Sequence, residues 1–228
     1  MKRIFSAWSV LIVLALAASA YSQTAKPISL DSPANQKPRN VKTEQVQHKG
    51  RKALRVTDDA LPNSGDGDRL LILTGTDFKN GVIEVELAGE PMASAVAGGA
   101  RGFVGIAFRA LEGGAKFECF YLRPTNGRAD DQVRRNHSVQ YISYPDFPWQ
   151  KLRKDFPEKY ESYVDLAPSE WTKVKIEVRG TTAKLYVHGA SQPTLIVNDL
   201  KLGEGSGAIA LWVGPGTIAH FSNLRVSP

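Results

Sequence analysis

Hydrophobic and polar residues alternate strictly in two neighbouring segments near the C-terminal end of the chain. The first covers residues 173–179 and the second 183–188, with Gly180-Thr181 between them. A period of two places every second side chain on the same face of a β-strand, and glycine in a short connection favours a tight turn. The pair therefore predicts a β-hairpin. Its core-facing residues are expected to be Val174, Ile176, Val178, Leu185 and Val187.

Short segments of the same kind recur along most of the chain, separated by turn-forming residues. Residues 82–87 alternate apolar and acidic positions, as a strand with one solvated face does, whereas 103–110 and 117–122 are apolar on both faces, as central strands are. Further strands are expected at 41–46, 53–56, 69–73, 138–144, 208–213 and 218–226. The one helix-like piece, 149–160, is interrupted by Pro157. Many short strands with regular turn signals predict an all-β sandwich or barrel.

The N-terminus has the features of an export signal. Lys2 and Arg3 precede an apolar run, and the small residues at its end fit cleavage after Ala20 or after Ser22. The predicted divisions of the chain are a signal peptide over 1–22, an extended lead-in over 23–40 and a single β-sandwich domain over 41–228. No later segment approaches the roughly 20 apolar residues that a membrane span requires. The expected location is therefore the periplasm or the extracellular space.

Charge and cysteine content limit the kinds of partner and chemistry that are expected. The formal net charge is +6, and removal of Lys2 and Arg3 lowers it to +4. The basic residues are spread along the chain and form no stripe, so nucleic acid is not an expected partner. The single cysteine, Cys119, excludes an intrachain disulfide, and its apolar neighbours predict a buried, unreactive thiol.

The segment from Tyr121 to Tyr141 departs from ordinary sandwich chemistry. It joins two apolar strands and holds four arginines, two aspartates, two asparagines, two glutamines and a histidine. Loops on a rigid scaffold concentrate binding groups, and planar polar side chains offer paired donors or acceptors to sugar hydroxyls. The segment therefore predicts a carbohydrate-binding site. Its expected ligand-binding residues are Arg123, Asn126, Arg128, Asp131, Arg135, His137, Gln140 and Tyr141, together with Trp149 of the next loop.

The next loop is rich in aromatic residues, whose faces can stack on pyranose rings. They are Tyr144, Phe147, Trp149, Phe156, Tyr160 and Tyr163. An alternative stays open for both loops. The charged residues can equally form a salt-bridge network that orders a long loop, with the aromatic residues covering the core.

Other site chemistries have weaker support. The four histidines lack the spacing of a metal-binding motif. Asp66 and Asp68 lie in the turn 63–68, a candidate calcium site, but the run lacks the full ligand set of a calcium loop, and no other cofactor is expected. Glu84 and Glu86 have the alternate spacing of a glycosidase carboxylate pair, yet their strand pattern favours the solvated face of an outer strand.

Three patches in the second half of the chain carry a family resemblance. They are 105–109 with Phe117-Glu118, 170–178 with 183–189, and 207–211 with 221–226. Together they resemble the 3-keto-disaccharide hydrolase domain, a family of the concanavalin A-like lectin/glucanase superfamily, and laminin-G-like domains share much of the pattern. The resemblance implies a concanavalin-like jelly-roll β-sandwich of two antiparallel sheets and activity on 3-keto sugars. By position it implies that Arg109 and Glu118 are cleft residues.

The chain also departs from that family at several polar positions. Apolar residues stand there at Phe103-Val104, Phe120, Leu122 and 211–213. The arginine-rich loop is then a candidate substitute site.

Three functions are compatible with these patterns. The first is carbohydrate binding without turnover. The second is a glycoside or 3-keto-disaccharide hydrolase or lyase, with Glu118 or Asp131 as acid/base, His137 as a proton shuttle that titrates near neutral pH, and Arg109 polarising a sugar oxygen. The third is a structural or protein-interaction domain whose loop charges are paired and buried. Convergence of Arg109, Glu118 and His137 in one cleft would favour the enzyme.

Overall fold

The computed structural model describes residues 24–60, 68–111 and 113–228, and every structural statement below concerns these residues. The predicted signal peptide, residues 1–22, lies outside them. Most of the candidate calcium turn, including Asp66, also lies outside them.

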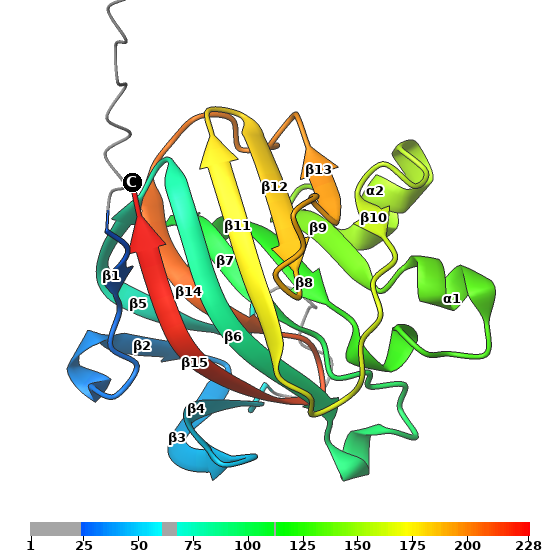
Figure 1. The fold of residues 1–228 in the computed structure, drawn as a ribbon, viewed down its shortest axis with the longest axis horizontal. Coiled ribbons are helices and arrows are strands. Elements are labelled where there is room, and N and C mark those ends of the chain that lie inside the picture. The colour runs from blue at the N-terminus through cyan, green and yellow to red at the C-terminus, as the bar shows by residue number, and fades with distance from the viewer. Residues whose placement is uncertain (1–23, 61–67, 112) are drawn as a thin grey trace, which may run out of the picture.

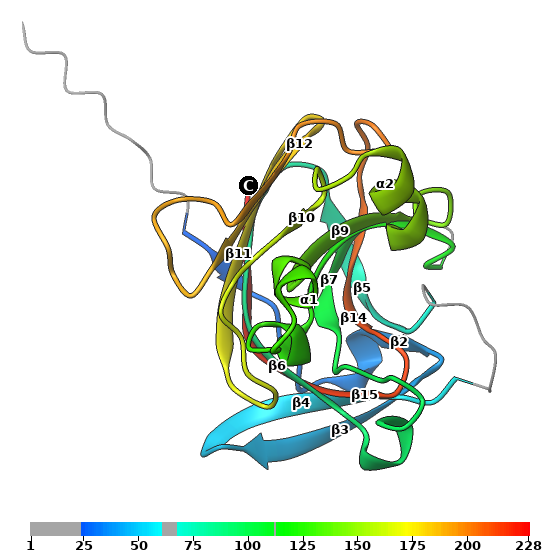
Figure 2. The same cartoon turned by 90° about the vertical axis from the view of Figure 1, so that its right-hand side faces the viewer.

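Two antiparallel β-sheets face each other (Figures 1 and 2). The front sheet, nearer the viewer in Figure 1, consists of β1 (Lys26–Pro27), β3 (Val41–His48), β4 (Arg51–Asp58), β6 (Gly81–Pro91), β11 (Thr172–Arg179), β12 (Thr182–Val187), β13 (Leu195–Val197) and β15 (Thr217–Ser227). The back sheet consists of β2 (Gln36–Arg39), β5 (Leu70–Phe78), β7 (Val104–Leu111), β8 (Lys116–Leu122), β9 (Val139–Tyr144), β10 (Glu161–Ser162) and β14 (Gly207–Val213).

The strand order is that of a jelly-roll sandwich. The front sheet runs β13-β12-β11-β6-β15-β4-β3, with β1 paired to β15, and the back sheet runs β10-β9-β8-β7-β14-β5-β2. Each sheet contains three pairs of consecutive strands, and its other neighbours are distant in sequence, so the sheets are built from interleaved segments. The prediction of an all-β jelly-roll sandwich of two antiparallel sheets is confirmed.

The predicted hairpin is formed by β11 and β12. Val174 pairs with Val187 and Ile176 with Leu185. All five residues expected in the core, Val178 included, are at most 5 % exposed. Strict alternation predicts this hairpin well because one face of the front sheet packs on the back sheet and the other meets solvent.

The acidic strand β6 has the same two faces. Ile83 and Val85 are buried, whereas Glu84 is exposed and Glu86 is partly exposed beside Arg51, 2.7 Å away. Glu84 pairs across the sheet with Lys175. The two glutamates therefore lie on a solvated face, as their pattern favours, although β6 is the middle strand of the front sheet and not an outer one.

The segment before residue 41 is more than a lead-in. Lys26 pairs with Val226 in the front sheet, and residues 36–39 pair with 70–73 in the back sheet. Its polar and proline-containing sequence hides this role, because edge strands tolerate proline and solvated side chains. The sandwich therefore begins before residue 41.

The back sheet is buried on both of its faces at its centre. β7 and β8 are buried along almost their whole length. One face packs on the front sheet, and the other is covered by loops and by α2 (Trp149–Asp155), which lies beside β9 (Figure 2). This covered outer face is where the candidate site lies.

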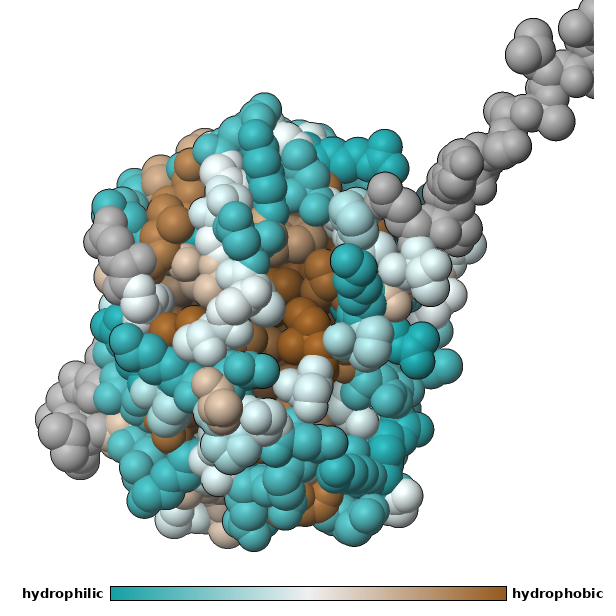
Figure 3. All heavy atoms as spheres, turned by 90° about the vertical axis from the view of Figure 1, so that its left-hand side faces the viewer, coloured by the Kyte–Doolittle hydropathy of each residue, from teal (hydrophilic) through white to brown (hydrophobic). Residues whose placement is uncertain are grey.

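The helices of the described residues are short. Besides α2, which forms in the helix-like piece of the sequence, they are α1 (Gln132–Asn136), η1 (Pro33–Asn35), η2 (Ala93–Ala95) and η3 (Pro124–Asn126). None of these described helices has the length and apolar character needed to cross a membrane. Figure 3 shows the side of the molecule away from α1 and α2, where hydrophobic residues lie in a shallow hollow framed by hydrophilic ones.

Candidate functional site

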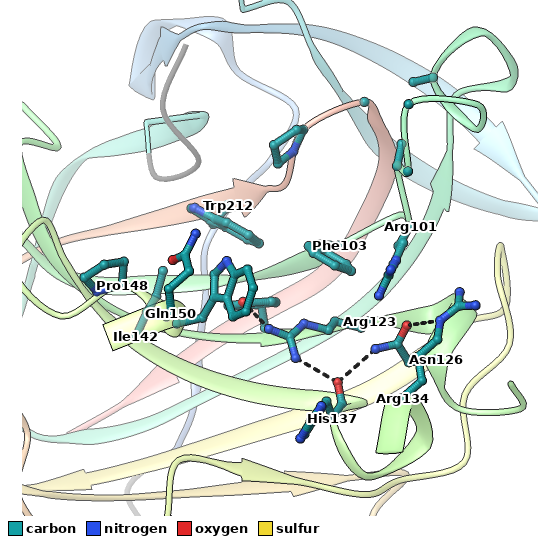
Figure 4. A pocket seen from close by; sticks show the side chains of 18 of the residues that line it. Arg101, Phe103, Arg123, Asn126, Arg134, His137, Ile142, Pro148, Gln150 and Trp212 are labelled. Carbon is teal, nitrogen blue, oxygen red and sulfur yellow. Dashed lines mark hydrogen bonds between the residues drawn. The ribbon is translucent and has the colours of Figure 1, made fainter. Parts of the chain in front are cut away.

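A pocket of about 870 Å³ lies on the outer face of the back sheet (Figure 4). Pockets that bind small ligands usually measure about 300–1,000 Å³. Its floor comes from the strands, and its walls come from two loops, α2 and a turn. The lining residues are Ser94, Ala95, 98–101, Phe103, Tyr121, Arg123, Asn126, Arg134, His137, Ile142, Tyr144, 148–151, Arg153, Trp212, Pro215 and Gly216.

The floor of the pocket is aromatic. The rings of Tyr121 and Trp212 lie 4.6 Å apart between centroids, and Phe103 lies 5.6 Å from Tyr121. Tyr121 and Trp212 both pair with Gly105 of the strand between them. A Cβ atom on Gly105 would collide with the Phe120 carbonyl oxygen and the Tyr121 side chain, so the absent side chain allows the two large rings to approach each other.

Arg123 is held in place at the edge of this floor. Its Nη2 donates to the Tyr121 hydroxyl (2.9 Å) and to Gln140 Oε1 (3.0 Å), and its Nη1 donates to the His137 carbonyl oxygen (3.0 Å). Its Cζ lies 5.1 Å from the Tyr121 ring centroid and 5.7 Å from that of Trp149. The cation is thus fixed by neutral acceptors and aromatic faces.

Arg134 and Arg101 lie at one end of the pocket (Figure 4). Arg134 Nε donates to Asn126 Oδ1 (3.2 Å), and its Nη2 lies 3.4 Å from Thr125 Oγ1. The Arg101 side chain makes no hydrogen bond or ion pair within the described part of the chain. Burial lowers the pKa of Arg101, and the neighbouring Arg134, Arg123 and Arg153 lower it further.

His137 contacts a buried carboxylate that is paired with a guanidinium group below the pocket. Its Nε2 lies 3.0 Å from Glu161 Oε2, and the same carboxylate accepts from Arg153 Nε (2.8 Å) and Nη2 (3.0 Å). Burial lowers the pKa of His137, and Arg153 and Arg123 act in the same direction, against the opposing effect of Glu161. Burial and the two arginines thus favour the neutral form of the imidazole.

Trp149 forms one wall of the pocket. It is the first residue of α2, and its ring centroid lies 4.7 Å from Arg153 Cζ and 5.7 Å from Arg123 Cζ. These two cation–π contacts help to hold the ring where it lines the pocket.

Solved structures identify the fold. The carbohydrate-binding module CBM66 from Bacillus subtilis superposes with a TM-score of 0.52 at 13% identity, covering 85% of this chain and 98% of the module. A Bacillus subtilis protein of unknown function with a galectin-like fold gives 0.52 at 11% identity, covering 89% and 97%. The chain therefore shares with these proteins a concanavalin-like jelly-roll fold.

Two further comparisons complete this picture. A β-glucanase from Bacillus licheniformis is also similar, with a TM-score of 0.49 at 13% identity over 90% of this chain and 100% of the glucanase. No protein-family model and no curated protein matches the sequence. The resemblance to 3-keto-disaccharide hydrolase and laminin-G-like domains therefore stays a prediction.

The concanavalin-like scaffold brings some of the predicted ligand-binding residues together. Arg123, Asn126, His137 and Trp149 line the pocket. Gln140 and Tyr141 are buried behind it, where Gln140 holds Arg123. The buried Gln140 thus helps to position Arg123 at the surface of the pocket.

The other predicted ligand-binding residues lie outside the pocket. Arg128 forms a surface ion pair with Asp165, with 2.7 Å between Arg128 Nε and Asp165 Oδ1. Asp131 caps α1 by accepting from the Arg134 amide (3.1 Å), and the Arg135 guanidinium lies over the Tyr163 ring, 5.6 Å from its centroid. Arg128 and Arg135 thus contact the segment around residues 163–165 and Asp131 caps α1, which fits the alternative in which the loop charges order a long loop.

Arg109 and Glu118 lie between the sheets instead of in the pocket. Arg109 is 1 % exposed and has a positive φ of 51°. Its guanidinium donates to the carbonyl oxygens of Lys79, Gly180 and Gly203 at 2.7–3.1 Å, and so ties three turns together. This is a structural clamp.

Glu118 belongs to a neighbouring buried cluster. Its carboxylate accepts from the Tyr141 hydroxyl (2.6 Å) and from the Leu202 amide (2.8 Å), and burial raises its pKa. Glu118 and Arg109 are absent from the pocket that His137 lines. The convergence of these three residues that would favour an enzyme therefore does not occur in the structure.

The remaining predictions concern metals and the thiol. The described residues contain no group of three or more His, Cys, Asp or Glu side chains that could hold a metal ion. Cys119 is fully buried, and burial raises the pKa of its thiol well above the usual value, as expected for an unreactive cysteine.

Several pocket residues gave no signal in the sequence. Phe103, Tyr121 and Trp212 belong to segments that are apolar on both faces, where a ring that faces the core and a ring that faces a pocket look the same. Arg101 stands alone in a glycine-rich loop, and its isolation among small residues is the one feature that could have indicated it.

Proposed function

We propose that the protein binds carbohydrate in the pocket on the outer face of the back sheet. The observation that carries this proposal is the pairing of an aromatic floor and wall with fixed hydrogen-bond donors in one pocket of suitable size. Apolar sugar faces stack on aromatic rings, and sugar hydroxyls pair with planar donors. The fold, shared with a carbohydrate-binding module, supports the proposal.

Binding without turnover is favoured because the described lining residues include no aspartate or glutamate. Glycoside hydrolysis usually requires two carboxyl groups flanking the scissile bond. Glu161 lies behind the lining, 3 % exposed at its side chain and engaged by Arg153 and His137. A bound glycan would therefore meet donors and aromatic faces but no free carboxylate.

The test is a titration of the purified protein with a glycan panel, with product detection by a reducing-sugar assay and ultraviolet absorbance. Trp149→Ala is expected to weaken binding at least tenfold, since truncating an aromatic anchor typically costs more than about 1.4 kcal/mol. Tyr163→Ala is the matched control, because Tyr163 is 44% exposed, lies under Arg135 and is absent from the pocket. Equal loss of affinity in both variants, or binding that survives Trp149→Ala, would contradict the proposal.

One observation favours an enzyme as the second candidate. His137 lines the pocket as an imidazole whose neutral form is favoured, and it is oriented by a carboxylate, as a general base is. A glycoside-processing hydrolase or lyase would release products that disappear in His137→Gln. If glycan binds and neither protein releases product, the protein is a binding module. If there is neither binding nor product, the interpretation as a structural or protein-interaction domain remains.

A further inference from the structure

The pocket contains a strong imbalance of charge. Five of its described lining residues are permanently cationic, and none is acidic. They are Arg101, Arg123, Arg134, Lys151 and Arg153. A concentration of one sign of charge in a partly enclosed site attracts ligands of the opposite sign.

Nearby carboxylates neutralise only two of these five cations. Arg153 is paired with Glu161, and Lys151 is paired with Asp155, 2.6 Å away on the surface. Neither carboxylate belongs to the lining residues. The positive charge of the other three arginines therefore stays available to a ligand.

The hydrogen-bond acceptors of Arg123 and Arg134 are all neutral. Arg123 donates to a hydroxyl, an amide oxygen and a backbone carbonyl, and Arg134 to the oxygen atoms of Asn126 and Thr125. Arg101 has no hydrogen-bond or ion-pair partner in the described segments. Burial lowers the pKa of Arg101, and repulsion from Arg134 and Arg123 lowers it further, against a smaller opposing effect of Asp131, so the three cations act on one another.

The pocket is also polarised along its length (Figure 4). Arg101, Asn126 and Arg134 lie at one end, and Pro148, Ile142 and Gln150 lie at the other. The aromatic residues Phe103 and Trp212 lie between the two ends. A ligand that matches this arrangement has an anionic group at one end and an uncharged ring beside it.

We propose that the ligand is an acidic glycan whose carboxylate or sulfate ester lies at the Arg101–Arg134 end, with the sugar ring over the aromatic floor. Guanidinium groups match the paired oxygen atoms of such oxyanions with two parallel hydrogen bonds, which an ammonium group cannot do. This inference rests on the proposed carbohydrate binding at the same pocket and adds the class of sugar.

The test compares charged and uncharged forms of the same polymer. Affinities are measured by calorimetry for polygalacturonate against its fully methyl-esterified form, and for dextran sulfate against dextran. At least one acidic polymer is expected to bind ten times more tightly than its uncharged partner. The pair that shows the difference distinguishes a carboxylate from a sulfate ligand.

Two variants distinguish binding in the pocket from general attraction to surface charge. Arg101→Gln removes an unpaired pocket cation and should weaken binding of the acidic polymer at least fivefold. Arg128→Gln removes the same charge from the Arg128–Asp165 surface pair and should change affinity less than twofold. Thermal melts of both variants confirm that the fold is intact, which is expected because neither side chain is buried in the core.

The outcomes distinguish this inference from the proposed function. Equal affinity for charged and uncharged polymers overturns the acidic ligand and leaves carbohydrate binding standing. Equal weakening by Arg101→Gln and Arg128→Gln also overturns it, because general attraction to the surface then explains the binding. Binding of no polymer in the panel overturns both proposals.

Discussion

The rings of Tyr121 and Trp212 lie with their centroids 4.6 Å apart across a glycine that separates their strands. The two residues belong to β8 and β14, and Gly105 of β7 lies between them. This contact makes one continuous aromatic surface from two strands that are not neighbours in the sheet. It depends on a position without a side chain.

Replacing that glycine should disturb the floor of the pocket. In Gly105→Ala the new methyl group meets the Phe120 carbonyl oxygen and the Tyr121 side chain. We expect a loss of about 1–3 kcal/mol in the free energy of unfolding, as for other overpacked sites, and weaker glycan binding. Chemical denaturation and calorimetry measure the two effects.

Gly205→Ala is the matched control for this substitution. A Cβ atom at Gly205 meets no other atom within 4 Å. This variant should retain its stability and its affinity. A Gly105→Ala protein that behaves in the same way would show that the aromatic floor tolerates a wider spacing.

Replacing Arg109 should lower the stability of the fold and leave glycan binding unchanged. In Arg109→Met the carbonyl oxygens of Lys79, Gly180 and Gly203 lose their donor. Each buried polar group without a partner typically costs about 1–3 kcal/mol, so we expect a loss of at least about 3 kcal/mol in the free energy of unfolding. Below the unfolding transition, the glycan affinity should match that of the unmodified protein. A variant that is stable but no longer binds would instead place Arg109 in the ligand site.

His220 should make the fold sensitive to mild acid. Its ring stacks on His48, with 3.8 Å between centroids, and Nδ1 has no hydrogen-bond partner in the described residues. Burial, then His48, then Arg55 lower the pKa of His220 from 6.5 to about 4. Between these two values the unfolded chain binds a proton that the folded chain does not bind. The free energy of unfolding should therefore fall as the pH drops from 6.5 to about 4, by up to about 3 kcal/mol.

His220→Phe provides the comparison, because phenylalanine keeps the stacked ring and cannot be protonated. The free energy of unfolding of this variant should fall less steeply over the same pH range. Glu118 acts in the opposite direction, since burial raises its pKa, but its contribution is present in both proteins and cancels in the difference. Identical pH profiles would show that His220 is not the group responsible.

The negative charge of Glu161 should weaken the attraction of the pocket for an anionic ligand. Its carboxylate lies behind the lining, against Arg153 and His137. Glu161→Gln removes one negative charge, so binding of an acidic glycan should strengthen, by about fivefold for a partly screened charge worth about 1 kcal/mol. Calorimetry at low and high salt checks this, because the gain should shrink as salt screens the charge. An unchanged or lower affinity in a folded variant would contradict it.

The sequence predicts the parts of the fold in which one face is polar. β6, β11 and β12 alternate because one side of the front sheet meets water, and their core positions follow directly. The back sheet gives no such signal, because both of its faces are covered at β7 and β8. A pocket on a covered face cannot be distinguished from core by periodicity.

The candidate site was predictable only in part, for a related reason. The arginine-rich loop marks the correct region, and Arg123, Asn126 and His137 do line the pocket. The direction of each side chain depends on η3 and α1, which are too short to leave a periodic pattern. Charge density therefore locates the loop without showing which of its side chains face the pocket.

Arg123 is immobilised before any ligand arrives. Its three hydrogen bonds to the Tyr121 hydroxyl, Gln140 and the His137 carbonyl already fix its rotamer in the free protein. Ordering a long side chain during association otherwise costs about 0.5–1.5 kcal/mol, and here that entropy is lost when the chain folds. The pocket is thus pre-organised at this residue, and the association rate is expected to depend on encounter and electrostatic steering more than on rearrangement of the protein.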